Sequence, residues 1–119
     1  MNDRDIEKEI IAKGKTAPRV TSADLEAAIV GEGYFTAAQG VRCAARDRGD
    51  DVWYSPQSLD LLTFCVLVLR NGFTVTGESA CASPENFDTE IGRRIARENA
   101  VNKVWPLLGY ALRDKLAAA

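Results

Sequence analysis

The side chains best suited to binding chemistry lie in the last third of the chain, on a stretch whose spacing predicts a long helix. Arginine presents a planar fork of N–H donors that matches phosphate oxygens, and asparagine amides donate to hydroxyls such as those of ribose. The candidate ligand-binding residues of this stretch are Arg93, Arg94, Arg97, Asn99, Asn102 and Arg113. The opposing interpretation is plain solvation, because most arginines on helix surfaces bind no ligand.

Three polar positions follow one line along this predicted helix. Arg94, Glu98 and Asn102 are spaced four residues apart, within the arc that also carries apolar residues. Polar groups at core-facing positions must be hydrogen-bonded or paired. Two interpretations stay open: an intrahelical Arg94–Glu98 pair with Asn102 bonded to a nearby carbonyl, or convergence of the three on a polar pocket or a subunit interface.

Two aromatic side chains complete the candidate set. Phe73 and Phe87 are suited to stacking on a nucleotide base, although aromatics at such spacings are usually core residues. Nothing in the sequence predicts catalysis, because the chain has no histidine and therefore no His-dependent triad, metal site or acid–base pair. We expect a protein that is not an enzyme and needs no metal or other cofactor.

The composition restricts the class of partner. The chain has 119 residues, 46% of them hydrophobic, and a net charge of −2, which is typical of one soluble domain over residues 1–119. A chain without excess positive charge is poorly suited to nucleic acid. Its apolar runs are too short to span a membrane, and its acidic N-terminus is unlike a signal peptide. We therefore expect a cytosolic protein with no nucleic-acid or membrane partner.

The element that must position these residues is a β-hairpin over residues 61–82. Asn71-Gly72 between two apolar runs predicts a two-residue type I′ turn. Such a turn places Phe64 opposite Ser79. The expected core face then comprises Leu62, Phe64, Val66, Val68, Phe73 and Val75, and the other face, which is half apolar, is expected to be partly covered.

Helices are predicted on both sides of the hairpin. Three of them precede it, over residues 2–13, 23 to about 30, and 36–45. A capping box at Thr21 begins the second of these helices, and glycines end it. A long helix follows Asp88, with a kink or break expected at Pro106. Its apolar face comprises Ile91, Ile95, Val101, Trp105, Leu108, Leu112 and Leu116. The predicted fold is α+β: an antiparallel sheet built on the central hairpin, packed against N-terminal helices and a long, Pro-kinked C-terminal helix.

The run from the hairpin into the last helix resembles a known family. The segments NGFTVTGES, PENFD, ARENA and W-P-L-x-G-Y carry the likeness over about residues 61–116, and TSADLEAAIVGEGYFTAAQG adds to it. The sequence is similar to the conserved short accessory proteins of tailed phages and prophages. Among these it resembles the first type of Thoeris anti-defence proteins.

The resemblance implies a function that the residues alone do not. Thoeris anti-defence proteins sequester cyclic ADP-ribose isomers made by bacterial TIR enzymes, and some also hold cyclic oligonucleotides, without cleaving them. A β-sheet flanked by helices, a homo-oligomer (dimer or higher) and action in the host cytoplasm are implied too, but no site residue is transferred. The alternative is a phage protein-interaction module that inhibits a host protein or assists assembly through an exposed apolar patch.

Overall fold

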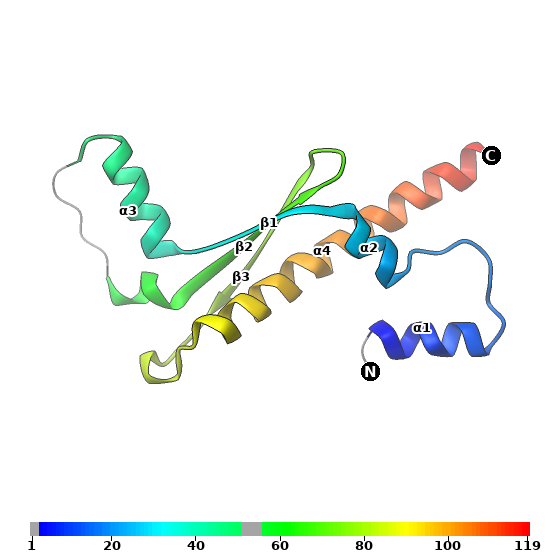
Figure 1. The fold of residues 1–119 in the computed structure, drawn as a ribbon, viewed down its shortest axis with the longest axis horizontal. Helices are drawn as coiled ribbons and strands as arrows, with labels where there is room; N and C mark the ends of the chain where they lie inside the picture. The colour runs from blue at the N-terminus through cyan, green and yellow to red at the C-terminus, as the bar shows by residue number, and fades with distance from the viewer. Residues whose placement is uncertain (1–2, 51–55) are drawn as a thin grey trace.

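The computed structural model describes residues 3–50 and 56–119, which form a three-stranded antiparallel sheet with helices around it (Figure 1). The helices are α1 (Asp3–Ala12), α2 (Ser22–Ala28), α3 (Ala37–Asp47) and α4 (Thr89–Ala118), with short 3-10 turns at Gln57–Leu61 and Pro84–Asn86. The strands are β1 (Ile29–Thr36), β2 (Leu62–Leu69) and β3 (Thr74–Ala80), in the order β1-β2-β3. The predicted α+β class, with its central β2–β3 hairpin, is confirmed.

Capping side chains determine where α2 and α3 begin. The Thr21 hydroxyl accepts a hydrogen bond from the Asp24 N–H at 3.1 Å, and the Asp24 carboxylate accepts one from the Thr21 N–H at 2.9 Å. Thr36 and Gln39 form the same reciprocal arrangement at α3. Both helix starts agree with the sequence prediction.

Strand β1 is absent from the sequence prediction, which extends the second helix to about residue 30. Ile29–Thr36 instead pairs with β2, after a register irregularity between Ile29 and Gly31. Glycine lowers the propensity for strand as well as for helix, so Gly31 and Gly33 leave this edge strand without a clear sequence pattern.

The hairpin loop has three residues rather than the predicted two. The Leu69 N–H donates to the Phe73 carbonyl at 2.8 Å, and the Gly72 N–H donates to the Leu69 carbonyl at 2.8 Å. Gly72 has a φ of +89°, whereas the φ of Asn71 is not positive. A type I′ turn needs positive φ at both positions, so the predicted turn type is wrong; a three-residue loop with glycine in the left-handed region takes its place.

The extra loop residue shifts the register by one and changes which side chains share a face. Phe64 lies opposite Glu78 rather than Ser79. The predicted core face is also wrong, because Leu62, Phe64, Val66 and Val68 are only half-buried and Phe73 is 56% exposed. The buried face carries Cys65, Leu67, Leu69 and Val75.

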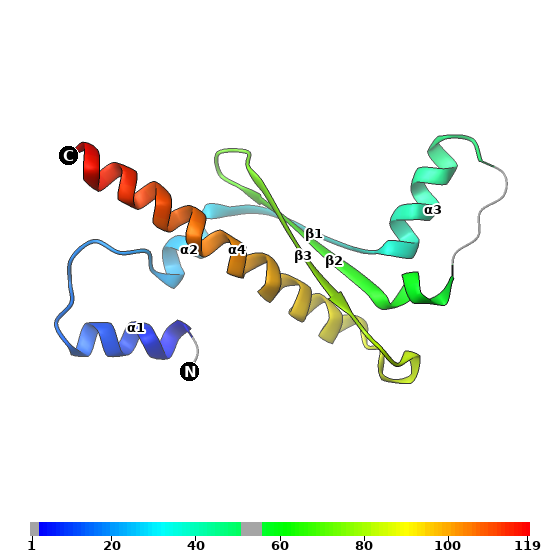
Figure 2. The same cartoon turned by 180° about the vertical axis from the view of Figure 1, so that it is seen from behind.

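Close packing of α4 explains which face is buried (Figures 1 and 2). A Cβ atom added at Gly77 would lie 2.3 Å from both the Ala96 carbonyl oxygen and the Ala100 nitrogen, so helix and strand meet backbone to backbone there. The face that carries Gly77 therefore takes the helix. The stripe of α4 that it meets is Gly92, Ala96, Ala100 and Val104.

The predicted apolar face of α4 is only partly correct. Val101, Trp105 and Leu108 pack at the edge of the core, but Ile91 and Ile95 are exposed because the small-residue stripe, not the largest side chains, faces the sheet. The helix is continuous, so of the two outcomes predicted at Pro106, a kink or a break, the break does not occur. Proline leaves the carbonyl four residues earlier without its helical donor. That residue, Asn102, is exposed and so is Pro106, which makes the loss tolerable.

Candidate functional site

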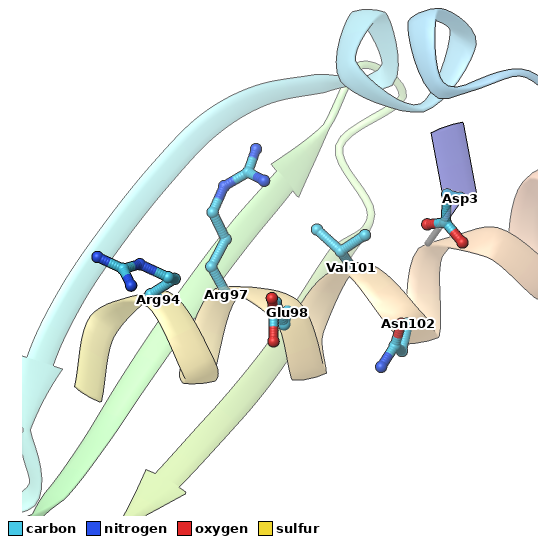
Figure 3. Close-up of a pocket in the computed structure, with 6 residues that line it drawn as sticks. All are labelled: Asp3, Arg94, Arg97, Glu98, Val101 and Asn102. Carbon is cyan, nitrogen blue, oxygen red and sulfur yellow. The ribbon is translucent and has the colours of Figure 1, made fainter. Parts of the chain in front are cut away.

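The largest concentration of the predicted polar residues lines an open pocket of about 400 Å³ on α4, here called the α4 pocket. Its lining residues are Asp3, Arg94, Arg97, Glu98, Val101 and Asn102 (Figure 3). Asp3 comes from α1 and the other five from one stretch of α4. The pocket therefore unites three of the eight predicted ligand-binding residues.

The start of α4 sets the line on which these side chains lie. Asp88 caps the helix as predicted, accepting a hydrogen bond from the Ile91 N–H at 3.0 Å. Four-residue spacing then brings Arg94, Glu98 and Asn102 onto one exposed face. In the part of the chain that the structure describes, no ion pair joins Arg94 to Glu98. The arrangement matches convergence on a polar pocket, not an intrahelical pair in the core.

Arg97 is held by internal ion pairs. Its Nε lies 2.9 Å from Glu32 of β1, and its Nη2 lies 3.0 Å from Glu26 of α2. The Tyr34 hydroxyl also donates to Glu32 at 2.8 Å. Hydrogen bonds from Arg97 and then Tyr34 hold the pKa of Glu32 below its usual range, and hydrogen bonding to Glu32 raises the pKa of Arg97. Arg97 thus joins α2, β1 and α4, and its charge is largely neutralised.

Replacing Arg97 by methionine is expected to lower the free energy of unfolding by about 1 kcal/mol at neutral pH, a modest value because solvent screens both carboxylates. The pKa of Glu32 is depressed in the folded protein, so the pair stabilises above the ordinary pKa of 4.5. That contribution is lost as the pH falls through the folded pKa. Urea unfolding of wild type and variant, at neutral pH and at about pH 3, measures this loss.

Arg48→Met is the matched control for this prediction. Arg48 pairs with Asp50 at 2.8 Å, but the pair is exposed and joins near neighbours in sequence. Removing it is expected to change stability by less than about 0.5 kcal/mol. Equal effects of the two substitutions at both pH values would show that Arg97 does not hold the three elements together.

Two other predicted residues also make internal contacts. The Arg93 guanidinium lies 5.5 Å from the centre of the Tyr34 ring, within cation–π range. The Asn99 side-chain amide donates to the Glu78 carbonyl of β3 at 2.8 Å. Both side chains help to fix α4 on the sheet.

The last three predicted residues lie away from the α4 pocket. Phe73 is at the hairpin loop, and Phe87 is half-buried just before α4, beside a different pocket that Ile91 and Gly92 also line. Arg113 is exposed farther along α4 and does not line the α4 pocket. Within one chain, therefore, neither aromatic ring stands beside Arg94.

Asp3 is the pocket residue that sequence analysis missed. It accepts a hydrogen bond from the Trp105 indole N–H at 3.1 Å, which ties α1 to α4. The two residues are far apart in the sequence, so no local signal predicts their contact.

The surroundings of two cysteines and the grouping of possible metal ligands bear on the chemistry of the described residues. Cys65 is fully buried, and burial raises the pKa of its thiol, which disfavours the nucleophilic thiolate. The Cys81 thiol donates to the Ser83 carbonyl at 3.2 Å. Among residues 3–50 and 56–119, no three Cys, Asp or Glu side chains are grouped so that they could hold a metal ion. Over the same ranges, no helix is both long enough and apolar enough to cross a membrane.

Comparison with known proteins gives one match. The model of the phage protein (N4 Gp49/phage Sf6 gene 66) family matches residues 20–116. No curated protein and no solved structure matched the chain. The matched residues cover β1, the hairpin and nearly all of α4, so the elements that build the α4 pocket, except α1, lie within the family region. The chain belongs to the phage protein (N4 Gp49/phage Sf6 gene 66) family.

Proposed function

We propose that this chain is a phage-encoded anti-defence protein that binds a nucleotide-derived immune signal and holds it without cleaving it. The ligand class is a cyclic ADP-ribose isomer, or a cyclic oligonucleotide. The observation that carries the proposal is the state of two side chains at the α4 pocket: in the described part of the chain, no side-chain hydrogen bond or ion pair holds Arg94 or Asn102. A free guanidinium fork and a free amide on one open face are the groups that phosphate and ribose require.

We infer from the charge of the α4 pocket that a ligand with two phosphates needs a second copy of the chain. Arg97 is already neutralised by Glu26 and Glu32, while Asp3 and Glu98 each add a negative charge. One free arginine does not balance two phosphates. We propose that a homo-oligomer, dimer or higher, brings two α4 pockets together so that each ligand meets arginines from two chains.

The surface of the chain supports this assembly. It exposes 8370 Å², about 2,000 Å² more than a compact monomer of 13.0 kDa is expected to expose. The radius of gyration is 18.5 Å, against about 13.5 Å for a compact domain of this length. Stable protein–protein interfaces bury surface on the scale of this excess.

A second surface, apolar and on the side of the sheet away from the α4 pocket, is available for the further subunit contacts of an oligomer higher than a dimer. The side of the sheet turned away from α4, here called the open sheet face, carries Phe35, Leu62, Phe64, Val66 and Val68. Phe35 and Phe64 stack on it with ring centres 5.3 Å apart. Ile91 and Ile95 on α4 are also exposed, on a separate part of the surface. Exposed apolar surface of this kind is typical of interaction sites.

The composition of the chain favours binding without cleavage. It has no histidine, and its one buried thiol is poorly ionised. Hydrolysis of a pyrophosphate or a glycosidic bond needs a positioned acid, base, nucleophile or metal. The proposed protein acts in the host cytoplasm, where a soluble signal would be held at the oligomer's pockets.

A thermal-shift titration with cyclic ADP-ribose isomers, followed by recovery of the ligand, tests the proposal. We expect a saturable rise in melting temperature, because a ligand that binds only the folded state stabilises it by mass action. Denaturing the complex should release the ligand with its mass unchanged. A flat titration with every isomer tried, or recovery of a hydrolysed product, would refute the proposed function.

The open sheet face also favours a second candidate function, a phage module that inhibits a host protein or assists assembly. The Phe35–Phe64 stack would then contact a different protein instead of a second copy. Light scattering separates the two, because this alternative predicts a monomer that leaves the face free. A stable homo-oligomer that loses its subunit contacts in Phe64→Glu would favour the first function.

A further inference from the structure

A second pocket, of about 320 Å³, lies where the hairpin loop meets the C-terminal half of α4, and is here called the hairpin-tip pocket. Its lining residues are Arg19, Val20, Asp24, Arg70, Leu108, Ala111, Leu112 and Lys115. They come from the segment before α2, from α2 itself, from the hairpin loop and from α4. None of them lines the α4 pocket, so any ligand here binds independently of the proposed signal.

The hairpin-tip pocket carries uncompensated positive charge. Arg19, Arg70 and Lys115 face a single carboxylate, that of Asp24. The Asp24 carboxylate already accepts a hydrogen bond in the cap of α2. Hydrogen bonds from the backbone of Thr21, and then from its hydroxyl, lower the pKa of Asp24, and Arg19 and Arg70 contribute less. Among the described residues, none of the three cations has an ion-pair partner within 4.0 Å.

The most pronounced anomaly is the guanidinium of Arg19. Its Nη1 atom is buried, yet it has no hydrogen-bond partner among the described residues. A buried donor on a charged group is costly to leave unpaired. An anion held in the pocket would satisfy it, and this distinguishes the site from a set of solvated surface cations.

The hairpin fixes Arg70 at the pocket. The Arg70 backbone N–H donates to the Ala28 carbonyl at the end of α2 at 2.9 Å. The loop that contains Arg70 is closed by the hydrogen bond from the Gly72 N–H to the Leu69 carbonyl. Arg70 therefore projects from backbone that is hydrogen-bonded on both sides, which fixes where its side chain begins beside the pocket.

An apolar compartment adjoins the cationic one. A pocket of about 250 Å³ shares Arg70, Leu108 and Ala111 with it, and is otherwise lined by Ala28, Leu69, Asn71, Phe73 and Leu107. Phe73 is more than half exposed here, so its ring is available to a ligand. The phenyl ring and the shared arginine place an aromatic surface directly beside the positive charge.

We propose that the hairpin-tip pocket binds the phosphate group of a small phosphorylated molecule, with an attached planar or apolar group against Phe73. Arg19, Arg70 and Lys115 hold the phosphate. The hydrophobic compartment then selects phosphate esters with an apolar or aromatic part over free inorganic phosphate.

Titration of the ¹⁵N-labelled full chain with adenosine 5′-monophosphate, adenosine and inorganic phosphate tests this site. The monophosphate is expected to bind at least about tenfold more tightly than either fragment, with amide shifts centred on Arg70, Phe73 and Lys115. Arg70→Ala and Lys115→Ala should each weaken it about tenfold. Phe73→Ala should weaken the monophosphate but leave phosphate binding unchanged.

Matched controls keep the test specific. Arg46→Ala and Lys103→Ala each remove an exposed cation that does not line the hairpin-tip pocket, and both should bind the monophosphate like wild type. Arg94→Ala should also leave it unchanged, which separates this site from the α4 pocket. Three results would each overturn the proposal. The first is wild-type affinity in both Arg70→Ala and Lys115→Ala, the second is amide shifts centred on Arg94 and Asn102, and the third is no binding by folded wild type.

Discussion

Gly77→Ala is expected to destabilise the protein by about 3 kcal/mol or more, the upper range for overpacking a core. The added methyl carbon would lie 2.3 Å from the Ala96 carbonyl oxygen and the Ala100 nitrogen. These are backbone atoms of a helix and cannot rotate away as a side chain would. The whole helix must retreat from β3, which opens the core around Val104 and Leu67.

Gly33→Ala is the matched control, because Gly33 is also a strand glycine but has nothing within 4 Å of the added Cβ. We expect its stability to stay within about 0.5 kcal/mol of wild type. Urea unfolding at one fixed protein concentration measures both variants, because the stability of an oligomer depends on concentration. Equal midpoints for the two alanine variants would contradict the backbone-to-backbone contact.

The double substitution Arg94→Ala with Asn102→Ala is expected to lower affinity for a cyclic ADP-ribose isomer by about 100-fold or more. The estimate rests on the loss of charged and amide hydrogen bonds at the α4 pocket. Both side chains are exposed and unpaired among the described residues, so the variant should keep its fold and melting temperature. Isothermal titration calorimetry measures the affinity and circular dichroism the fold.

Arg113→Ala is the control for charge alone. Arg113 is an exposed arginine of the same helix that does not line the α4 pocket. Its removal should change affinity by no more than about threefold, the size of a screened long-range effect. A loss in Arg113→Ala as large as in the double variant would place the ligand elsewhere on α4.

Local chemistry made much of the fold predictable. The helix starts at Thr21, Thr36 and Asp88 depend on side chains within three residues, and all three are found. The β2–β3 hairpin likewise follows from adjacent apolar runs around Asn71-Gly72. These features need no knowledge of the remainder of the chain.

Features set by tertiary packing were not predictable from local patterns. Strand β2 is apolar on both sides, so its sequence does not say which face α4 covers. The answer depends on the close approach at Gly77, a contact with a helix many residues away. The exposure of Ile91 and Ile95 follows from the same contact.

The candidate site was likewise predictable only where neighbouring residues along the chain determine it. Arg94 and Asn102 share a face because helix periodicity demands it, and their spacing was enough to suggest a polar pocket. Asp3 joins them only through its bond to Trp105, and Arg19 meets Arg70 only where the hairpin reaches α2. The spacing of residues along the sequence predicts neither of these contacts.

Native mass spectrometry of the full chain, before and after incubation with cyclic ADP-ribose isomers, tests the central claim most directly because it reports subunit count and bound mass together. We expect a homo-oligomer that gains the mass of intact ligand. A monomer that gains no ligand mass, or an oligomer that releases hydrolysed ligand, would contradict it.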